Sequence, residues 1–168
     1  MKLTRGLAKA IVDVIAIDKE AQRRIDSALA YIIPDSFGGA GGVRNFGFAL
    51  IETYTGNGQP TKEQDSLVCY GIAEYTYELI NKAIAKSKQE SMLRTIKKAS
   101  YINRDLYNIA HQATLITFQD GTEVVFDWHA TLNSKNPLIY PSPEDFRKGT
   151  NSVTFDNFTE FNDQGNKK

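Results

Sequence analysis

The stretches HQATLITF (residues 111–118), QDGT (119–122) and EVVFDW (123–128) decide the fold of this chain. The first and third are rich in β-branched and aromatic residues, which favour strands. They flank an Asp-Gly pair, which is a strong signal for a tight hairpin turn. The sequence therefore predicts two antiparallel strands joined by a short loop.

The length of that loop decides which side chains share a face of the hairpin. A two-residue turn at Asp120-Gly121 would pair residue 119 with 122 and point Asp127 away from His111. A three-residue loop, 119–121, pairs 118 with 122 and places position 127 opposite Ala113, on the face that carries His111. Such a loop favours a left-handed residue at its end, where Gly121 stands. We therefore expect the three-residue loop with a bulge at Gly121, and His111 within reach of Asp127.

Helical periodicity dominates the chain before this hairpin. Apolar residues recur at three- and four-residue steps from Cys69 to Ile84, and Asp65 or Ser66 is a natural N-cap, so Cys69 is expected in the first turn of a helix. The same periodicity predicts a helix over residues 3–33, ended by Pro34.

The remaining segments give weaker signals. We expect a second helical piece near Gln89 to Ala99, a weak strand at Ser152 to Phe155, and a polar tail from residue 162. With 168 residues, of which 41% are hydrophobic, the chain can bury a core of its own. The sequence thus predicts a single α+β domain over residues 1–168, with an N-terminal helical part (1–60), a core (65–140) and a polar tail (162–168).

Composition excludes several classes of function. Twenty Lys and Arg balance twenty Asp and Glu, which argues against binding nucleic acid or a membrane through bulk charge. One cysteine excludes an intramolecular disulfide, and one Cys with two His cannot form a Cys-rich zinc site. We therefore expect neither a cofactor nor a metal. The apolar stretch from Ala10 to Ile17 is interrupted by Asp13, which is not typical of a secretory signal.

A local basic cluster follows the cysteine helix. The cluster can be an ordinary solvated helix face without a specific function. It can also be a patch that steers an acidic protein partner. The cluster consists of Lys82, Lys86, Lys88, Arg94, Lys97 and Lys98.

The only cysteine of the chain, Cys69, is the candidate nucleophile. A thiolate is the nucleophile in thiol catalysis, and the positive end of a helix dipole lowers the pKa of a thiol. An imidazole such as that of His111 can take the thiol proton and return it to a leaving group, while Asp127 on the other ring nitrogen fixes the tautomer. The backbone N–H of Cys69 could donate to an oxyanion. The candidate catalytic residues are therefore Cys69, His111 and Asp127.

Alternatives stand beside this assignment. Taken alone, a cysteine such as Cys69 is more often inert core than catalyst. His129 competes with His111 for the role of base, although no acidic orienter is evident for it from the sequence. Gln64 could supply a second oxyanion donor, but its spacing of five residues before Cys69 fits that role poorly.

The order of these motifs resembles the papain-like and transglutaminase-like superfamily over roughly residues 65–140. The stretch Val68-Cys-Tyr-Gly-Ile-Ala73 is similar to the cysteine-helix entry of that superfamily. The segments His111-Gln-Ala-Thr-Leu-Ile116 and Val124-Val-Phe-Asp-Trp128, with Asp-Gly between them, are similar to its histidine–hairpin–aspartate segment. The compact spacing is also similar to the papain-like deamidase domains of bacterial toxins, including the dermonecrotic-toxin group.

This resemblance implies a papain-like or transglutaminase-like core in which the cysteine helix packs on an antiparallel sheet. The implied reaction is attack on a carboxamide by a protein-glutamine deamidase or transglutaminase. The runners-up are a papain-like protease, a peptidoglycan amidase of the NlpC/P60 kind, and a non-enzymatic α+β binding module. The resemblance further implies a target protein in a recipient cell, an immunity partner, and delivery by a specialised secretion system or within a larger toxin that acts in the target-cell cytoplasm.

Overall fold

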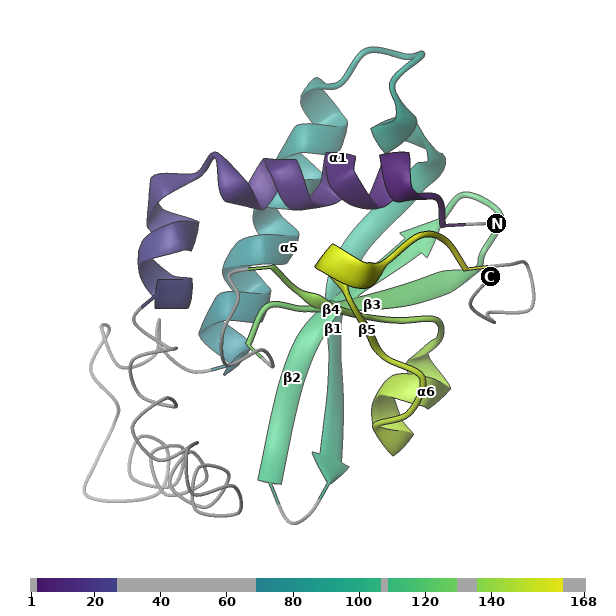
Figure 1. The fold of residues 1–168 in the computed structure, drawn as a ribbon. Coiled ribbons are helices and arrows are strands. Elements are labelled where there is room, and N and C mark those ends of the chain that lie inside the picture. Colours follow the sequence, from purple (N-terminus) through teal and green to yellow (C-terminus); the bar gives the residue numbers. More distant parts are fainter. Residues whose placement is uncertain (1–2, 27–68, 107–108, 130–135, 162–168) are drawn as a thin grey trace.

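The sheet at the centre of the molecule is a five-stranded antiparallel meander (Figure 1). The computed structural model describes residues 3–26, 69–106, 109–129 and 136–161. The strands are β1 (Ile96–Leu106), β2 (Ile109–Phe118), β3 (Glu123–Asp127), β4 (Leu138–Tyr140) and β5 (Val153–Thr154), and each pairs with the next. Helix α5 (Cys69–Lys86) packs on β1 and β2, so the fold is α+β as expected.

The β2–β3 hairpin has the predicted register. Thr114 pairs with Phe126 and Leu115 with Val125, and the Phe118 N–H donates to the Thr122 carbonyl at 2.9 Å. The loop is therefore residues 119–121, and Gly121 takes a left-handed conformation with φ 88°. Both the three-residue loop and its glycine are confirmed.

The N-terminal helical segment is two helices rather than the one expected over residues 3–33. Helix α1 (Arg5–Ala16) is capped by the Thr4 hydroxyl, and a second helix follows over 19–26, beyond which the chain lies outside the described residues. Asp18 starts the second helix, since its carboxylate accepts the Ala21 N–H at 2.8 Å. Ile17 at the break is 83% exposed. The apolar periodicity continued through the break because both helices bury a face against the same core.

The helix expected near Gln89 to Ala99 is wrong. A 3-10 turn, η1 (Met92–Thr95), leads directly into β1. The register of β1 shifts by a bulge between Ile96 and Lys98, so Ile96 and Ala99 both face the main core. Ile102 then faces the opposite side of the sheet. Buried residues at steps of three imitate a helix here, although they result from a bulged strand that is covered on both faces.

Two apolar clusters hold the layers together. The larger one lies between the sheet and the helices α1, α5 and 19–26, and the smaller one lies between the other face of the sheet and α6 (Pro143–Lys148). The weak strand expected at Ser152 to Phe155 is confirmed by β5. Near the two ends of the described chain, Thr4 and Glu160 form an antiparallel bridge. Among the described residues, no helix is long and apolar enough to cross a membrane.

Candidate active site

Cys69 is the first residue of α5 that the structure describes. The N-caps expected at Asp65 or Ser66, and the oxyanion donor considered at Gln64, lie outside the described residues. Cys69 itself is buried, with 5% of its surface exposed. The thiol is therefore held inside the protein at the start of the described helix.

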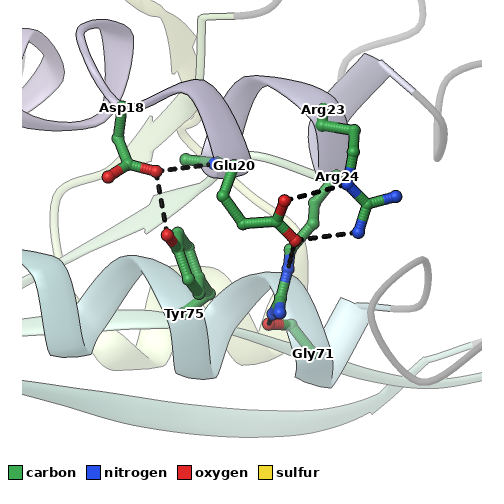
Figure 2. A network of polar contacts seen from close by, with 7 residues as sticks. Asp18, Glu20, Arg23, Arg24, Gly71 and Tyr75 are labelled. Carbon is green, nitrogen blue, oxygen red and sulfur yellow. Dashed lines mark hydrogen bonds and ion pairs between the residues drawn. The ribbon is translucent and has the colours of Figure 1, made fainter. Parts of the chain in front are cut away.

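A polar network fixes this end of α5 to the second N-terminal helix (Figure 2). The Arg24 guanidinium lies 4.3 Å from the ring centroid of Tyr75 and donates to the Gly71 carbonyl at 3.4 Å. The Tyr75 hydroxyl donates to Asp18 at 2.9 Å, and Glu20 pairs with Arg24 at 2.9 Å. Because Gly71 is two residues from Cys69, these contacts position the helical turn that carries the thiol.

Strands β2 and β3 bring His111 and Asp127 together. His111 Nε2 lies 2.6 Å from Asp127 Oδ2, and the two side chains are 8% and 1% exposed. The other carboxylate oxygen, Oδ1, accepts the backbone N–H of His129 at 3.0 Å. Both oxygens of Asp127 are thus engaged, and its carboxylate fixes the orientation of the His111 ring.

Three groups converge where β3 ends. Ligand atoms of Cys69, His111 and His129 all lie within 4.8 Å of one another. In the observed register position 127 falls opposite 113, so His111 lies past the last residue of β3. Side-chain alternation gives His111 the α6 face of the sheet, whereas α5 packs on the opposite face. The thiol and the imidazole therefore meet past the last residue of β3, where that strand no longer lies between the two faces of the sheet.

The arrangement of the His111 ring leaves one nitrogen available. Nε2 is used by Asp127, whereas Nδ1 is buried and has no hydrogen-bond partner among the described residues. Buried polar atoms are nearly always paired, so such an atom calls for an explanation. The centroid of the His111 ring lies 5.9 Å from that of the Phe146 ring and 6.2 Å from that of the His129 ring.

Apolar and polar side chains together line a small pocket beside the thiol. Its apolar lining includes Ile72, Phe126 and Trp128, and its polar lining includes Gln112, Asp127 and His129. Farther along α5, the Thr76 and Thr114 hydroxyls lie 2.7 Å apart, and Thr76 also donates to the Ala73 carbonyl at 2.9 Å. The site is thus a polar cluster at the end of an apolar layer.

Charge is distributed unequally between the two imidazoles. Burial lowers the pKa of His111, but the neighbouring Asp127 carboxylate and the Cys69 side chain raise it above its usual value overall. Burial, together with the proximity of His111, lowers the pKa of His129 to about 3. Burial raises the pKa of Asp127, but His111 and the His129 backbone lower it below its ordinary value overall. His111 is therefore the imidazole that can carry a proton beside the thiol, and His129 is neutral.

The structure brings all three candidate catalytic residues together, and a fourth side chain, that of His129, lies beside them. Sequence reasoning treated His129 only as a rival of His111, whereas its ring lies beside both Cys69 and His111. The signal for this was local: His129 lies two residues after Asp127, the last residue of β3, so its backbone N–H reaches the carboxylate.

The basic cluster does not form the helix face expected of it. Lys82 and Lys86 are on α5, Lys97 and Lys98 are on β1, and all four are exposed. Arg94 is half-buried and donates to the Ser87 carbonyl at 3.0 and 3.3 Å, so it closes the turn between helix and strand.

Comparisons with protein-family models, curated proteins and solved structures give no significant match to this chain. The structure itself establishes the fold class, which is α+β with a helix packed on a five-stranded antiparallel sheet.

Proposed function

We propose that this chain is a thiol enzyme of the papain-like or transglutaminase-like type, with Cys69 as the nucleophile, His111 as general base and acid, and Asp127 as the orienting residue. The single observation that carries the proposal is the state of the His111 ring. One nitrogen is bonded to a buried carboxylate, while the ring also lies beside the only thiol of the chain. This is the arrangement in which an imidazole can take a thiol proton and later deliver it.

The reaction that fits these residues is acyl transfer from a carboxamide. Cys69 Sγ attacks the carboxamide carbon while its proton moves to His111 Nδ1, and the carbonyl oxygen becomes an oxyanion. The C–N bond then breaks, and ammonia leaves with the proton from His111. The resulting thioester is attacked by water, which regenerates the thiol and leaves a carboxylate, or by an amine, which leaves a new amide.

The small pocket beside Cys69 supports a short carboxamide side chain of a protein as the substrate. Ile72, Phe126 and Trp128 can exclude water around a short side chain, which strengthens hydrogen bonds and charge interactions at the reacting carbon. We therefore infer a protein-glutamine deamidase or transglutaminase, acting as a toxin or effector domain on a protein of a recipient cell. An immunity protein and a specialised delivery route belong to this proposal.

The test is mass spectrometry of target-cell proteins exposed to the wild-type chain or to Cys69→Ala. Wild type is expected to convert specific glutamines to glutamates, or to cross-link them to amines, and the variant to do neither. Asp105→Asn, which alters an exposed acidic residue on β1, is the matched control and should behave as wild type. Cleaved peptide bonds instead of modified glutamines would make the chain a protease, and identical proteomes would overturn the proposal.

A further inference from the structure

The whole chain contains two histidines and one cysteine, and all three side chains meet at one point. A thiol triad needs only one of these imidazoles. His129 is left over by that chemistry, although it is 6% exposed and its ligand atom lies within 4.8 Å of those of Cys69 and His111. Burying a second imidazole there calls for a further role.

We propose that Cys69, His111 and His129 form a binding site for Zn²⁺, and that the bound metal holds the thiol inactive. The inhibitory part rests on the proposed function, whereas the metal site itself does not. Zinc binds Cys sulfur at about 2.3 Å and His nitrogen at about 2.0 Å in a tetrahedral arrangement. Such ligand atoms lie roughly 3.5 Å apart, so small side-chain rotations from the observed separations would close the site.

The surroundings of the three groups fit this metal. A histidine that binds zinc almost always donates its other ring N–H to a carboxylate, which fixes the ring. His111 does so through Nε2 to Asp127, and its buried Nδ1 has no partner among the described residues. His129 is buried beside both groups, with its ring centroid 6.2 Å from that of His111.

Metal binding and thiol catalysis would exclude each other. Zinc would bond to Sγ as a thiolate, with release of the thiol proton, and to His111 Nδ1. These are the two atoms that the proposed reaction uses. Three protein ligands leave one coordination position for water. The chain would thus be stored with a blocked thiol and become active when the metal is withdrawn.

The site can be tested on the untagged full chain with Co²⁺ as a spectroscopic probe for Zn²⁺. We expect one Co²⁺ per chain, a thiolate-to-cobalt charge-transfer band, and d–d bands of tetrahedral intensity that Zn²⁺ abolishes by competition. Cys69→Ala should lose the charge-transfer band, and His129→Gln should weaken binding. Asp127→Asn should weaken it about 10–100-fold through loss of ring orientation, and the control Asp105→Asn should bind normally.

A second measurement uses only the wild-type chain, so it does not depend on whether a variant folds. X-ray absorption at the zinc edge of the wild-type chain should count one sulfur and two imidazole nitrogens. Zn²⁺ should also block alkylation of Cys69, and a chelator should restore it. Absence of a thiolate–metal band, a ligand set without sulfur, or alkylation that Zn²⁺ leaves unchanged would overturn the proposal. An enzyme active only with zinc would overturn the inhibitory role.

These outcomes are separable from those of the proposed function. A metal-free chain that modifies glutamines but binds no Co²⁺ would remove the metal site and leave the thiol enzyme. A chain that binds Zn²⁺ with one sulfur and two nitrogens, yet has no carboxamide activity after chelation, would remove the enzyme and leave the metal site.

Discussion

Two buried polar groups join α5 to β2, and they differ in how their hydrogen bonds are used. In the Thr76–Thr114 pair, one hydroxyl donates to the Ala73 carbonyl and the hydroxyls bond each other at 2.7 Å, so the pair is closed. In the Cys69–His111–Asp127 cluster, the His111 Nδ1 atom has no partner among the described residues. We infer from this difference that the closed pair serves packing, whereas His111 Nδ1 is kept for a substrate or a ligand.

The sharpest way to test this difference is to remove the thiol. Cys69→Ala should abolish carboxamide activity, with a loss of about 10⁴-fold or more, because no other nucleophile lies in the cluster. Its free energy of unfolding should fall by only about 0.8 kcal/mol, the value of one buried methylene. Activity assays and denaturant unfolding check both halves. Activity retained per folded molecule would contradict the assignment.

Removing the base should be as damaging as removing the nucleophile. His111→Ala is expected to match Cys69→Ala in activity, since the pair acts as a unit, and the double variant should be no worse. Asp127→Asn should be about two powers of ten less damaging, because an orienting residue contributes less than the nucleophile–base pair. Steady-state kinetics on these four variants and on His129→Gln checks the order. A larger effect of His129→Gln than of His111→Ala would transfer the role of base to His129.

The closed pair should show the opposite behaviour. Thr76→Val removes the main partner of the Thr114 hydroxyl and should cost about 1–3 kcal/mol of stability while leaving activity per folded molecule unchanged. Replacing both threonines by valine should recover most of that loss, since no buried hydroxyl is then unpaired. Thermal unfolding of single and double variants measures this. A double variant no more stable than the single one would mean that the pair is not closed.

The smallest effect is expected from a change in the turn that sets the register of β2 and β3. Gly121→Ala forces a Cβ into the left-handed region at φ 88° and should cost about 1–2 kcal/mol. No heavy atom lies within 4 Å of that Cβ, so the cost is in the backbone alone. Gly121→Asn, which tolerates this conformation better, should lose less. Activity per folded molecule should be retained in both, because burial of Val125 and Phe126 also fixes the register.

Sequence could predict the hairpin because local rules determine it. The Asp-Gly pair, the left-handed glycine and the alternation of faces gave the register of β2 and β3, and with it the contact between His111 and Asp127. Strand β1 could not be predicted in this way. Its bulge and its burial on both faces produce spacing of three that resembles a helix.

Capping residues in the sequence mark two further features that apolar periodicity does not detect, helix α6 and the break at Asp18. Helix α6 has Ser142 as N-cap, Pro143 at its first position and a left-handed Gly149 after its end, which together mark a short helix. The break at Asp18 was a capping signal within an apolar pattern. The meeting of Cys69 with both histidines, in contrast, depends on where α5 docks past the end of β3. No local pattern encodes that distance.

Whether His111 activates the Cys69 thiol is tested by the rate at which a small thiol alkylator modifies Cys69 in the native chain, freed of metal by a chelator. The site of modification is read by mass spectrometry. We expect a single adduct at Cys69 that forms while the chain is folded, and a marked slowing in His111→Gln but not in Thr76→Val. An adduct that forms only after unfolding, at the same rate in wild type and His111→Gln, would show instead that Cys69 is a packing residue and not a nucleophile.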